Sequence, residues 1–255
     1  MRPQVSLFGI GIDAVTMPEA VARLQHWIGT SAAPCRYVVT PNVDHTILYQ
    51  HNPRLRDAYQ AASLVLADGM PVLWASRLFG KPLPQRVTGS DLVPALFDAS
   101  CGDRPQRVFL LGGGPGVAER AAANIHRRWA HVQVVGTLAP PQGFEHDPGQ
   151  NQEIVKTINT AAPDCLVVGL GAPKQELWVH RHYRQLDVPL ALCVGATIDF
   201  LAGEKRRAPG WMQRCGLEWL YRCAREPRRL GGRYARDALI FPRLLWQEWR
   251  RAASA

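Results

Sequence analysis

Short apolar runs rich in β-branched residues alternate with segments of helical length along the first four fifths of this 255-residue chain. The later runs are apolar at nearly every position, as strands covered on both faces of a sheet are. This alternation predicts a Rossmann-like α/β fold, with a mainly parallel sheet and helices on both of its faces. The expected strands are Val5–Phe8, Tyr37–Thr40, Leu64–Ala67, Arg107–Leu111, Val132–Val135, Cys165–Gly169 and Leu190–Val194.

The segments between the strands have helical patterns, and the pattern changes near Gly203. The expected helices are Pro18–Ile28, Val43–Ala62, Gly116–Ala130, Gln150–Ala161 and Pro173–Gln185. Beyond them the chain has helical spacing without strand-like runs. We therefore expect two units, an α/β domain at 1–204 and a helical appendage at 205–255. Pro227, the pair Gly231–Gly232 and Pro242 are expected to break the appendage into short helices.

The net charge of +9 is concentrated in the appendage. Residues 205–255 hold 13 Lys and Arg against 4 Asp and Glu, and 12 of these cations are Arg. Four of the eight tryptophans also lie there. A basic, Trp-rich helical segment favours an anionic partner, such as an acidic membrane surface, a nucleic acid or a phosphorylated substrate. The alternative is a set of docked helices whose Arg faces are simply solvated.

The six cysteines contain no CxxC pair, which disfavours a zinc site and a disulfide framework. A reducing cytoplasm is the expected compartment. The stretches free of charge are too short to cross a bilayer, and we expect neither a membrane-spanning helix nor a signal peptide.

Ligands of parallel sheets bind beyond the carboxyl ends of the strands. The loops that follow five of the expected strands should therefore converge on one crevice. These loops are Thr40–His45, Ala67–Pro71, Gly112–Gly116, Gly169–Glu176 and Gly195–Phe200.

The glycine-rich loop contains Gly112, Gly113 and Gly114 and leads from a strand into a helix. Small residues there allow backbone N–H groups to approach a diphosphate at the helix N-terminus. Tight strand-to-helix turns also require glycine, so both interpretations remain open. The loop is not a P-loop, because no Gly-Lys-Ser/Thr follows it.

Asp68 directly follows an apolar strand, and two interpretations of it are equally supported. It is either a general base with a raised pKa or the N-cap of the following helix. Thr40 and Asn42 lie at the end of the neighbouring strand. They are either turn and cap residues or groups that bind a sugar hydroxyl and orient the base.

No Asp-x-Asp sequence occurs, although many nucleotide-sugar transferases use that pair to hold a divalent ion. The histidines show no clear metal-ligand spacing, and we expect His45 to be structural rather than a ligand. We therefore expect no metal site. The surplus of Arg can neutralise a diphosphate through bidentate contacts.

Together these motifs resemble the WecG/TagA/CpsF glycosyltransferases, glycosyltransferase family 26. The resemblance extends from about Phe8 to about Arg236. It rests on Thr40-Pro41-Asn42, Ala67-Asp68-Gly69, RVTGSDL from Arg86, LLGGGPGVAE from Leu110, VGLGAPKQELW from Val168, VGATIDFLAGEKRRAPGWMQRCGLEWLYR from Val194, and EPRRL from Glu226.

The resemblance implies an inverting, metal-independent hexosyltransferase without a cofactor, working in cell-surface polysaccharide biosynthesis. Such enzymes move N-acetylmannosamine, its uronic acid or glucose from a UDP-sugar to a sugar on polyprenyl diphosphate. They build teichoic acids, common antigen and exopolysaccharides. The implied location is cytoplasmic, peripheral on the inner face of the membrane, and the resemblance leaves open whether copies of the chain form a homo-oligomer.

The resemblance also implies roles for individual residues. It assigns Asp68 as the base, with Thr40 and Asn42 beside it in the active site. Substrate-binding roles are implied for Gly112, Gly113, Gly114, Arg86, Gln175 near the donor, Asp199 as a ribose ligand, and Arg214, Arg222 and Arg225 of the appendage. Where family members often carry a Tyr that stacks on uracil, this chain offers only Phe144.

Two other function classes compete with the transferase. The glycine loops alone would fit an enzyme that binds a nicotinamide or methyl-donor cofactor, but the acidic ribose ligand expected after them is missing. The Arg-rich appendage alone would fit a protein that binds nucleic acid without catalysis. The resemblance favours the transferase over both, and with it no nucleic-acid partner.

Overall fold

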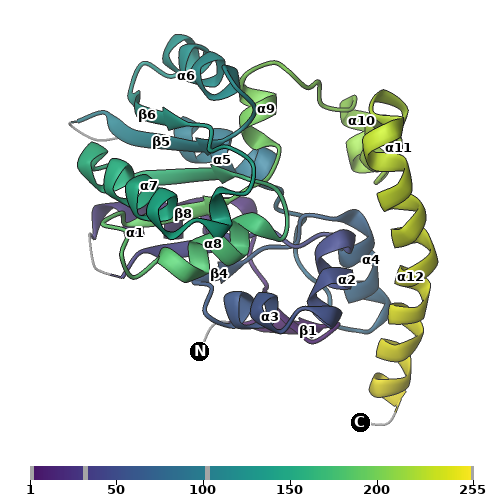
Figure 1. Cartoon of the computed structure of the whole chain (residues 1–255). Helices are drawn as coiled ribbons and strands as arrows, with labels where there is room; N and C mark the ends of the chain where they lie inside the picture. The colour runs from purple at the N-terminus through teal and green to yellow at the C-terminus, as the bar shows by residue number, and fades with distance from the viewer. Residues whose placement is uncertain (1–2, 31–33, 101–103, 254–255) are drawn as a thin grey trace.

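A six-stranded sheet forms the centre of the computed structural model, which describes residues 3–30, 34–100 and 104–253 (Figure 1). Its strand order is β4-β3-β8-β7-β5-β6, and every neighbouring pair is parallel. The predicted Rossmann-like, mainly parallel sheet is confirmed. Its strands are β3 (Arg36–Val39), β4 (Leu64–Val65), β5 (Gln106–Gly112), β6 (Val132–Leu138), β7 (Cys165–Gly169) and β8 (Leu190–Cys193).

Helices cover both faces of this sheet, as the continuous apolar runs predict. Successive strand residues point to opposite faces, so Tyr37 and Val39 enter one hydrophobic cluster and Val38 enters the other. One face packs against α1 (Met17–Gly29), α5 (Gly89–Asp98), α6 (Val117–Arg128) and α9 (Thr197–Leu201). The other packs against α2 (Val43–His51), α3 (Pro53–Gln60), α7 (Pro148–Ala161) and α8 (Lys174–His182), and α4 (Met70–Leu78) joins the same cluster.

The first expected strand does not join the main sheet. β1 (Gln4–Leu7) pairs antiparallel with β2 (Ile10–Asp13) in a separate hairpin. Phe8 and Gly9 form its two-residue turn, with φ of 54° and 81°. Such a turn matches the right-handed twist of the strands when both residues are left-handed. Local pairing thus keeps this strand out of the parallel sheet.

The single helix expected over Val43–Ala62 is wrong, because the chain forms α2 and α3 there. Pro53 has no N–H to donate and sits in the first turn of α3, where none is needed. The side chain of Asn52 accepts a hydrogen bond from Leu55 N at 3.1 Å and caps the new helix.

Of the expected breaks in the appendage, the one at Pro227 is confirmed, and those at Gly231–Gly232 and Pro242 are wrong. After α10 (Gly210–Arg214) and α11 (Glu218–Arg225), α12 runs without interruption from Pro227 to Ala253. Pro227 occupies the start of α12, where proline is tolerated. Gly231–Gly232 and Pro242 lie inside it, and contacts with the first unit outweigh their low helix propensity.

α12 runs along the outside of the first unit beside α2 (Figure 1). Glu248 accepts a hydrogen bond from the backbone N–H of Phe8 at 3.2 Å, and the rings of Phe8 and Phe241 lie 5.5 Å apart. Leu244 is buried in the hydrophobic cluster that also contains Phe8. Asp44 at the start of α2 accepts a hydrogen bond from Arg236 and pairs with Arg233 at 3.6 Å. Within the described ranges, no helix is both long and apolar enough to span a membrane.

Substitution of Gly112 tests how closely the ends of β5 and β7 pack against each other. A Cβ at Gly112, where φ is +118°, would lie 2.4 Å from the carbonyl oxygen of Gly169. Strain and overlap together predict that Gly112→Ala lowers the free energy of unfolding by at least about 2 kcal/mol in urea denaturation. Gly114→Ala is the matched control, because its Cβ would meet Val117 at an ordinary 3.5 Å. Equal stability of the two variants would contradict this packing.

Candidate active site

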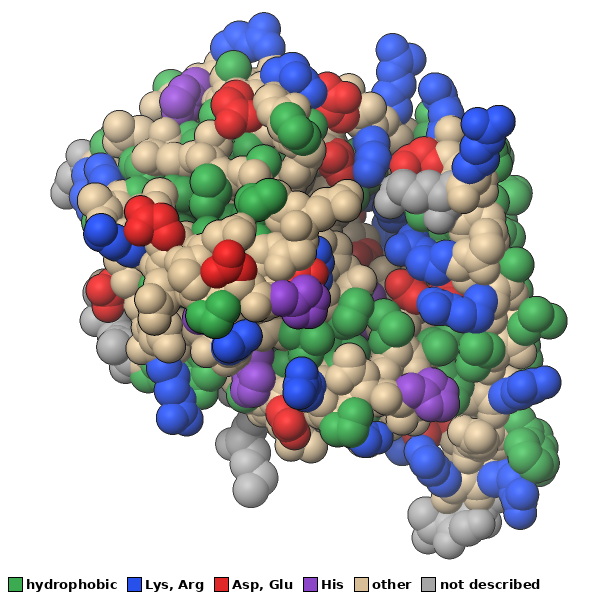
Figure 2. Space-filling view, viewed as in Figure 1, with side chains coloured by type: hydrophobic (Ala, Val, Ile, Leu, Met, Phe, Trp, Pro, Cys, Tyr) green, Lys and Arg blue, Asp and Glu red, His purple; other side chains and the backbone are tan. Residues whose placement is uncertain are grey.

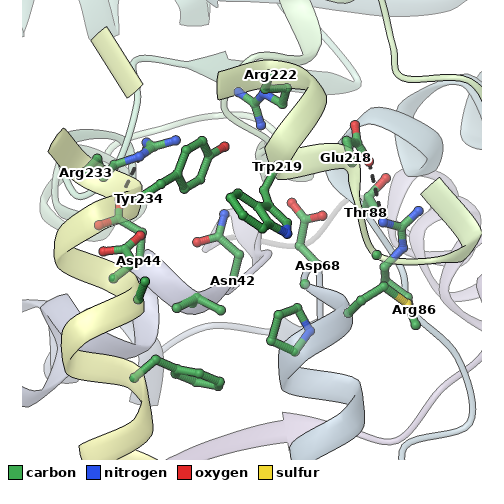
Figure 3. Close-up of a pocket in the computed structure, with 18 of the residues that line it drawn as sticks. Asn42, Asp44, Asp68, Arg86, Thr88, Glu218, Trp219, Arg222, Arg233 and Tyr234 are labelled. Carbon is green, nitrogen blue, oxygen red and sulfur yellow. Dashed lines mark hydrogen bonds and ion pairs between the residues drawn. The ribbon is translucent and has the colours of Figure 1, made fainter. Parts of the chain in front are cut away.

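A cavity of about 300 Å³ lies between the loops after β3 and β4 and the helices of the appendage (Figure 3). The first unit contributes Asn42, Asp68 and the segment from Arg86 to Ser90. The appendage contributes the opposite wall, from α11 and α12. Neither unit alone encloses this space, so the appendage is part of the site's architecture.

Backbone pairing places Asp68 at the cavity. Beyond β4, Leu66 N donates to Val39 O and Asp68 N donates to Pro41 O, both at 2.9 Å. This extends the parallel alignment to the loop that carries Asn42. The N-cap of α4 is Gly69, so the interpretation of Asp68 as a helix cap is wrong.

The Asp68 carboxylate takes part in none of the hydrogen bonds found within the described residues. Burial raises the pKa of Asp68 to about 6, and the negative charge of Glu218 adds to the effect. The positive charges of Arg86, His45 and Arg222 act in the opposite direction. A carboxylate with this pKa is mostly ionised near neutral pH yet basic enough to accept a proton.

Asn42 combines the two roles that its position in the sequence left open. Its Oδ1 accepts the backbone N–H of His45 at 3.3 Å and caps α2. Because Oδ1 is engaged there, the two N–H donors of the amide are left for the cavity that Asn42 lines (Figure 3).

Ion pairs hold the appendage over this edge of the sheet. Glu218, at the start of α11, pairs with Arg86 at 3.5 Å and with Arg207 at 3.1 Å. Arg207 also pairs with Asp91 of α5 at 2.9 Å. These pairs hold Glu218 and Arg86 together on one side of the cavity, beside Asp68 (Figure 3).

Two further arginines of the appendage line the cavity, Arg222 on α11 and Arg233 on α12. In each, Nε is buried and has no hydrogen-bond partner among the described residues. A buried donor of this kind costs free energy unless something else satisfies it. The arrangement suits an anion with several acceptor oxygens, such as a diphosphate.

The part of the cavity between α4 and α12 is apolar. Met70 and Pro71 of α4 face Ala238, Phe241 and Pro242 of α12 across it. Trp219 projects from α11 above Asp68 (Figure 3). The cavity therefore joins a cationic region to an apolar one.

The other predicted substrate-binding residues lie along the same sheet edge but outside the cavity lining. Gly112, Gly113 and Gly114 follow β5, where Gly113 N donates to Gly169 O at 3.3 Å. Gln175, at the start of α8, accepts from Gly195 N at 3.0 Å. Asp199 on α9 pairs with Lys205 at 2.9 Å. Their substrate-binding roles stay predictions.

Four further predicted residues do not line the cavity either. Thr40 is buried behind it and donates to Cys193 O at 3.2 Å. Arg214 and Arg225 are exposed. Phe144 is 2% exposed, with its ring packed into the core near Lys174. In this conformation Phe144 offers no free face for stacking on a base.

No group of three or more His, Cys, Asp or Glu side chains among the described residues is arranged to hold a metal ion. Among the described residues that line the cavity, the cationic side chains are those of Arg86, Arg207, Arg222 and Arg233.

Sequence reasoning did not single out several residues that build the cavity. Glu218 and Trp219 stand inside the GLEWLYR motif, which could have indicated them. No sequence pattern indicated Arg233 or Asp44, because these two residues pair only when α12 packs against α2.

This chain is similar to known glycosyl transferases. The profile of the glycosyl transferase WecG/TagA/CpsF family matches residues 5–255. A protein of Staphylococcus aureus strain MW2, named N-acetylglucosaminyldiphosphoundecaprenol N-acetyl-beta-D-mannosaminyltransferase, is 28% identical over 232 residues, 89% of this chain and 87% of the relative. A protein of the same name from strain NCTC 8325 / PS 47 matches to the same extent. These matches favour the transferase over the two other function classes.

The raised pKa of Asp68 has a consequence for stability. A carboxyl group whose pKa rises from 3.8 to about 6 on folding destabilises the folded state once it ionises. Asp68→Asn should therefore raise the free energy of unfolding by about 1–3 kcal/mol at about pH 8. The gain should shrink as the pH falls from about 6 toward 4, in urea denaturation at each pH.

Asp91→Asn serves as the control, because hydrogen bonds from Arg207 and Thr88 outweigh burial and lower the pKa of Asp91. This variant should be less stable than the wild type at about pH 8. A loss of stability in Asp68→Asn at that pH would contradict the environment described for Asp68.

Proposed function

The chain belongs to the WecG/TagA/CpsF family of glycosyl transferases, and we propose that it moves a hexose from a UDP-sugar to a sugar on polyprenyl diphosphate. The names of the staphylococcal relatives support N-acetylmannosamine as the sugar moved and an N-acetylglucosaminyl diphosphoundecaprenol as the acceptor. The uronic acid of N-acetylmannosamine and glucose are the alternative donors to be compared. The product belongs to cell-surface polysaccharide biosynthesis.

The observation that carries the proposal is a buried carboxylate with a raised pKa, Asp68, in a cavity that is also lined by four arginines. Asp68 takes the proton of the acceptor hydroxyl as its oxygen attacks the anomeric carbon of the donor. The new C–O bond forms as the bond from that carbon to the diphosphate oxygen breaks, and the electron pair leaves with UDP. Attack from the face opposite the leaving group inverts the anomeric centre.

Negative charge grows on the leaving diphosphate during this step. Arg222 and Arg233 line the cavity and each has a buried Nε without a hydrogen-bond partner among the described residues, and Arg86 lines the cavity as well. Guanidinium groups stabilise such charge most effectively where water is excluded. This supports a mechanism in which arginines do the work that a divalent metal does in other transferases.

Asn42 and Thr40 support Asp68 in the proposed reaction. The free N–H groups of Asn42 can hold a sugar hydroxyl beside the base. Thr40 ties the end of β3 to β8, which keeps the loop that carries Asn42 in place. Donor binding by the loops that contain Gly112–Gly114, Gln175 and Asp199 fits their position at the carboxyl ends of β5, β7 and β8.

The outer surface of α12 supports a membrane location. Leu239, Trp246 and Trp249 are 73%, 57% and 59% exposed. Figure 2 shows Lys and Arg side chains gathered along the same helix. Tryptophan at the interface and arginine near anionic headgroups both favour peripheral binding. The enzyme would then lie on the inner face of the membrane, with the apolar part of its cavity able to take the first prenyl units.

The reaction is tested with a prenyl-diphosphate sugar, a panel of UDP-sugars and mass analysis of the product. Transfer is expected from one donor of the panel and should persist in excess EDTA. Asp68→Asn should lower turnover by about 10²–10⁴-fold, because the base is lost, while UDP still stabilises the variant against heat. Wild-type turnover in Asp68→Asn would refute the assigned base, and loss of activity in EDTA with rescue by Mg²⁺ would refute metal independence.

The appendage is proposed to have two separable tasks, and reciprocal variants distinguish them. Replacing both Trp246 and Trp249 by Gln should weaken binding to anionic vesicles by about tenfold or more but leave transfer to a short, water-soluble acceptor unchanged. Arg222→Lys keeps the charge but loses the bidentate fork, so it should impair transfer to the soluble acceptor and leave vesicle binding intact. If the double Trp variant also loses soluble transfer, the outer face of α12 belongs to the catalytic site.

A further inference from the structure

A buried histidine–glutamate pair lies behind the cavity. His45 of α2 is 7% exposed and Glu176 of α8 is fully buried. Their Nε2 and Oε1 atoms are 3.2 Å apart. Neither residue lines the cavity, and the reaction described above does not use them.

Both ring nitrogens of His45 face acceptors. Nδ1 lies 2.8 Å from Asn42 Oδ1, and Nε2 faces Glu176 Oε1. The acceptor on Asn42 is an oxygen, because the same atom takes the backbone N–H of His45. Glu176 Oε1 also accepts an N–H of Gln175 at 2.8 Å. A neutral imidazole carries one N–H and could donate only one of these bonds to Asn42 and an ionised Glu176, so the contacts favour the protonated ring.

The charges around His45 agree with this assignment. Burial alone would lower the pKa of His45, but the hydrogen bond and charge of Glu176, with the charges of Asp44 and Asp68, raise it. Tyr59 and Cys193 also face Glu176, and burial raises the pKa of both, so they stay neutral.

His182 shows what burial does to a histidine without an acidic partner. It is 5% exposed, and its Nε2 is buried without a hydrogen-bond partner among the described residues. Burial lowers the pKa of His182. The two buried histidines thus differ in their surroundings, because acidic groups face His45 whereas Arg181 lies near His182.

We propose that His45 is a protonated positioning residue, locked by Glu176, that turns the Asn42 amide donors toward the cavity and places a cation behind Asp68. The proposal rests on the transferase function proposed above only for its kinetic consequence. Asn42 Oδ1, held twice by His45, cannot rotate into the cavity, so its N–H groups face the substrate side. The imidazolium also favours the ionised form of Asp68, which a base requires.

The same pair connects the loops of three strands. Glu176 holds the side-chain amide of Gln175, and Gln175 Oε1 holds Gly195 N after β8. His45 and Asn42 belong to the loop and helix after β3, and Gln175 and Glu176 follow β7. A single buried ion pair thus aligns the edge of the sheet around the cavity.

The protonation state of His45 is measurable without substrate. In protein labelled with ¹⁵N-histidine, His45 should show two protonated ring nitrogens at about pH 8, well above the ordinary histidine pKa of about 6.5. His182 should be neutral in the same spectrum, and His45→Gln and His182→Gln assign the two signals. A neutral His45 ring at about pH 8 overturns the proposal, whatever reaction the enzyme catalyses.

Glu176→Gln tests the role in the reaction, because it removes the charge with little change of shape. In this variant His45 should titrate at lower pH than in the wild type. Turnover should fall by about tenfold to 100-fold, with KM for the donor nearly unchanged, because the base and the amide lose their alignment.

The pH dependence of turnover separates positioning from a merely structural effect. The charged groups facing Asp68 are Glu218 and Arg222 of α11, Arg86, Arg207 and His45. Turnover should fall at low pH as Asp68 becomes protonated, with a midpoint expected at about pH 6 in the wild type. Loss of the His45 cation in His45→Gln or Glu176→Gln should move this acidic limb of the pH profile to higher pH. His182→Gln should leave turnover and its pH profile unchanged. An unmoved acidic limb in both His45→Gln and Glu176→Gln would overturn the proposal.

Discussion

The docking of α12 against the first unit is the constraint on which the cavity depends. Asp44, in the first turn of α2, pairs with Arg233 and Arg236. Phe241 and Leu244 of α12 pack into the hydrophobic cluster that contains Phe8. Partly buried carboxylate–guanidinium pairs are costly to break when one partner is removed. Arg233 links both functions of this contact, because its guanidinium group pairs with Asp44 and the residue also lines the cavity. Without the docked helix, Asp68 would stand on an open sheet edge in water.

Burial of this edge explains the chemistry of its charged groups. Solvent exclusion raises the pKa of Asp68, and the surrounding arginines and His45 limit the rise. Glu218 works against them, yet it is also the residue through which Arg86 and Arg207 fasten α11. The protonation state of Asp68 therefore depends on several opposed charges that act together in a cavity from which water is partly excluded.

The parts of this structure that could be predicted follow from periodicity and strand-end position. Apolar runs such as Cys165–Gly169 gave the parallel sheet, and the rule for strand ends placed Asp68 beside Asn42. Continuity of α12 could not be predicted, because local propensities at Gly231–Gly232 and Pro242 oppose it and tertiary contacts decide it. The partnership of His45 with Glu176 joins residues 131 positions apart and leaves no local pattern. The buried place of Phe144 depends on core packing that its loop sequence does not reveal.

The bond between Phe8 and Glu248 joins positions 240 residues apart. Every strand of the parallel sheet is synthesised before any residue of α12, because β8 ends at Cys193 and α12 begins at Pro227. The turn that receives Glu248 is among the first segments made, and the wall that completes the cavity is among the last. Translation order alone thus keeps Asp68 open to solvent, and its surroundings incomplete, until synthesis of the polypeptide is nearly finished.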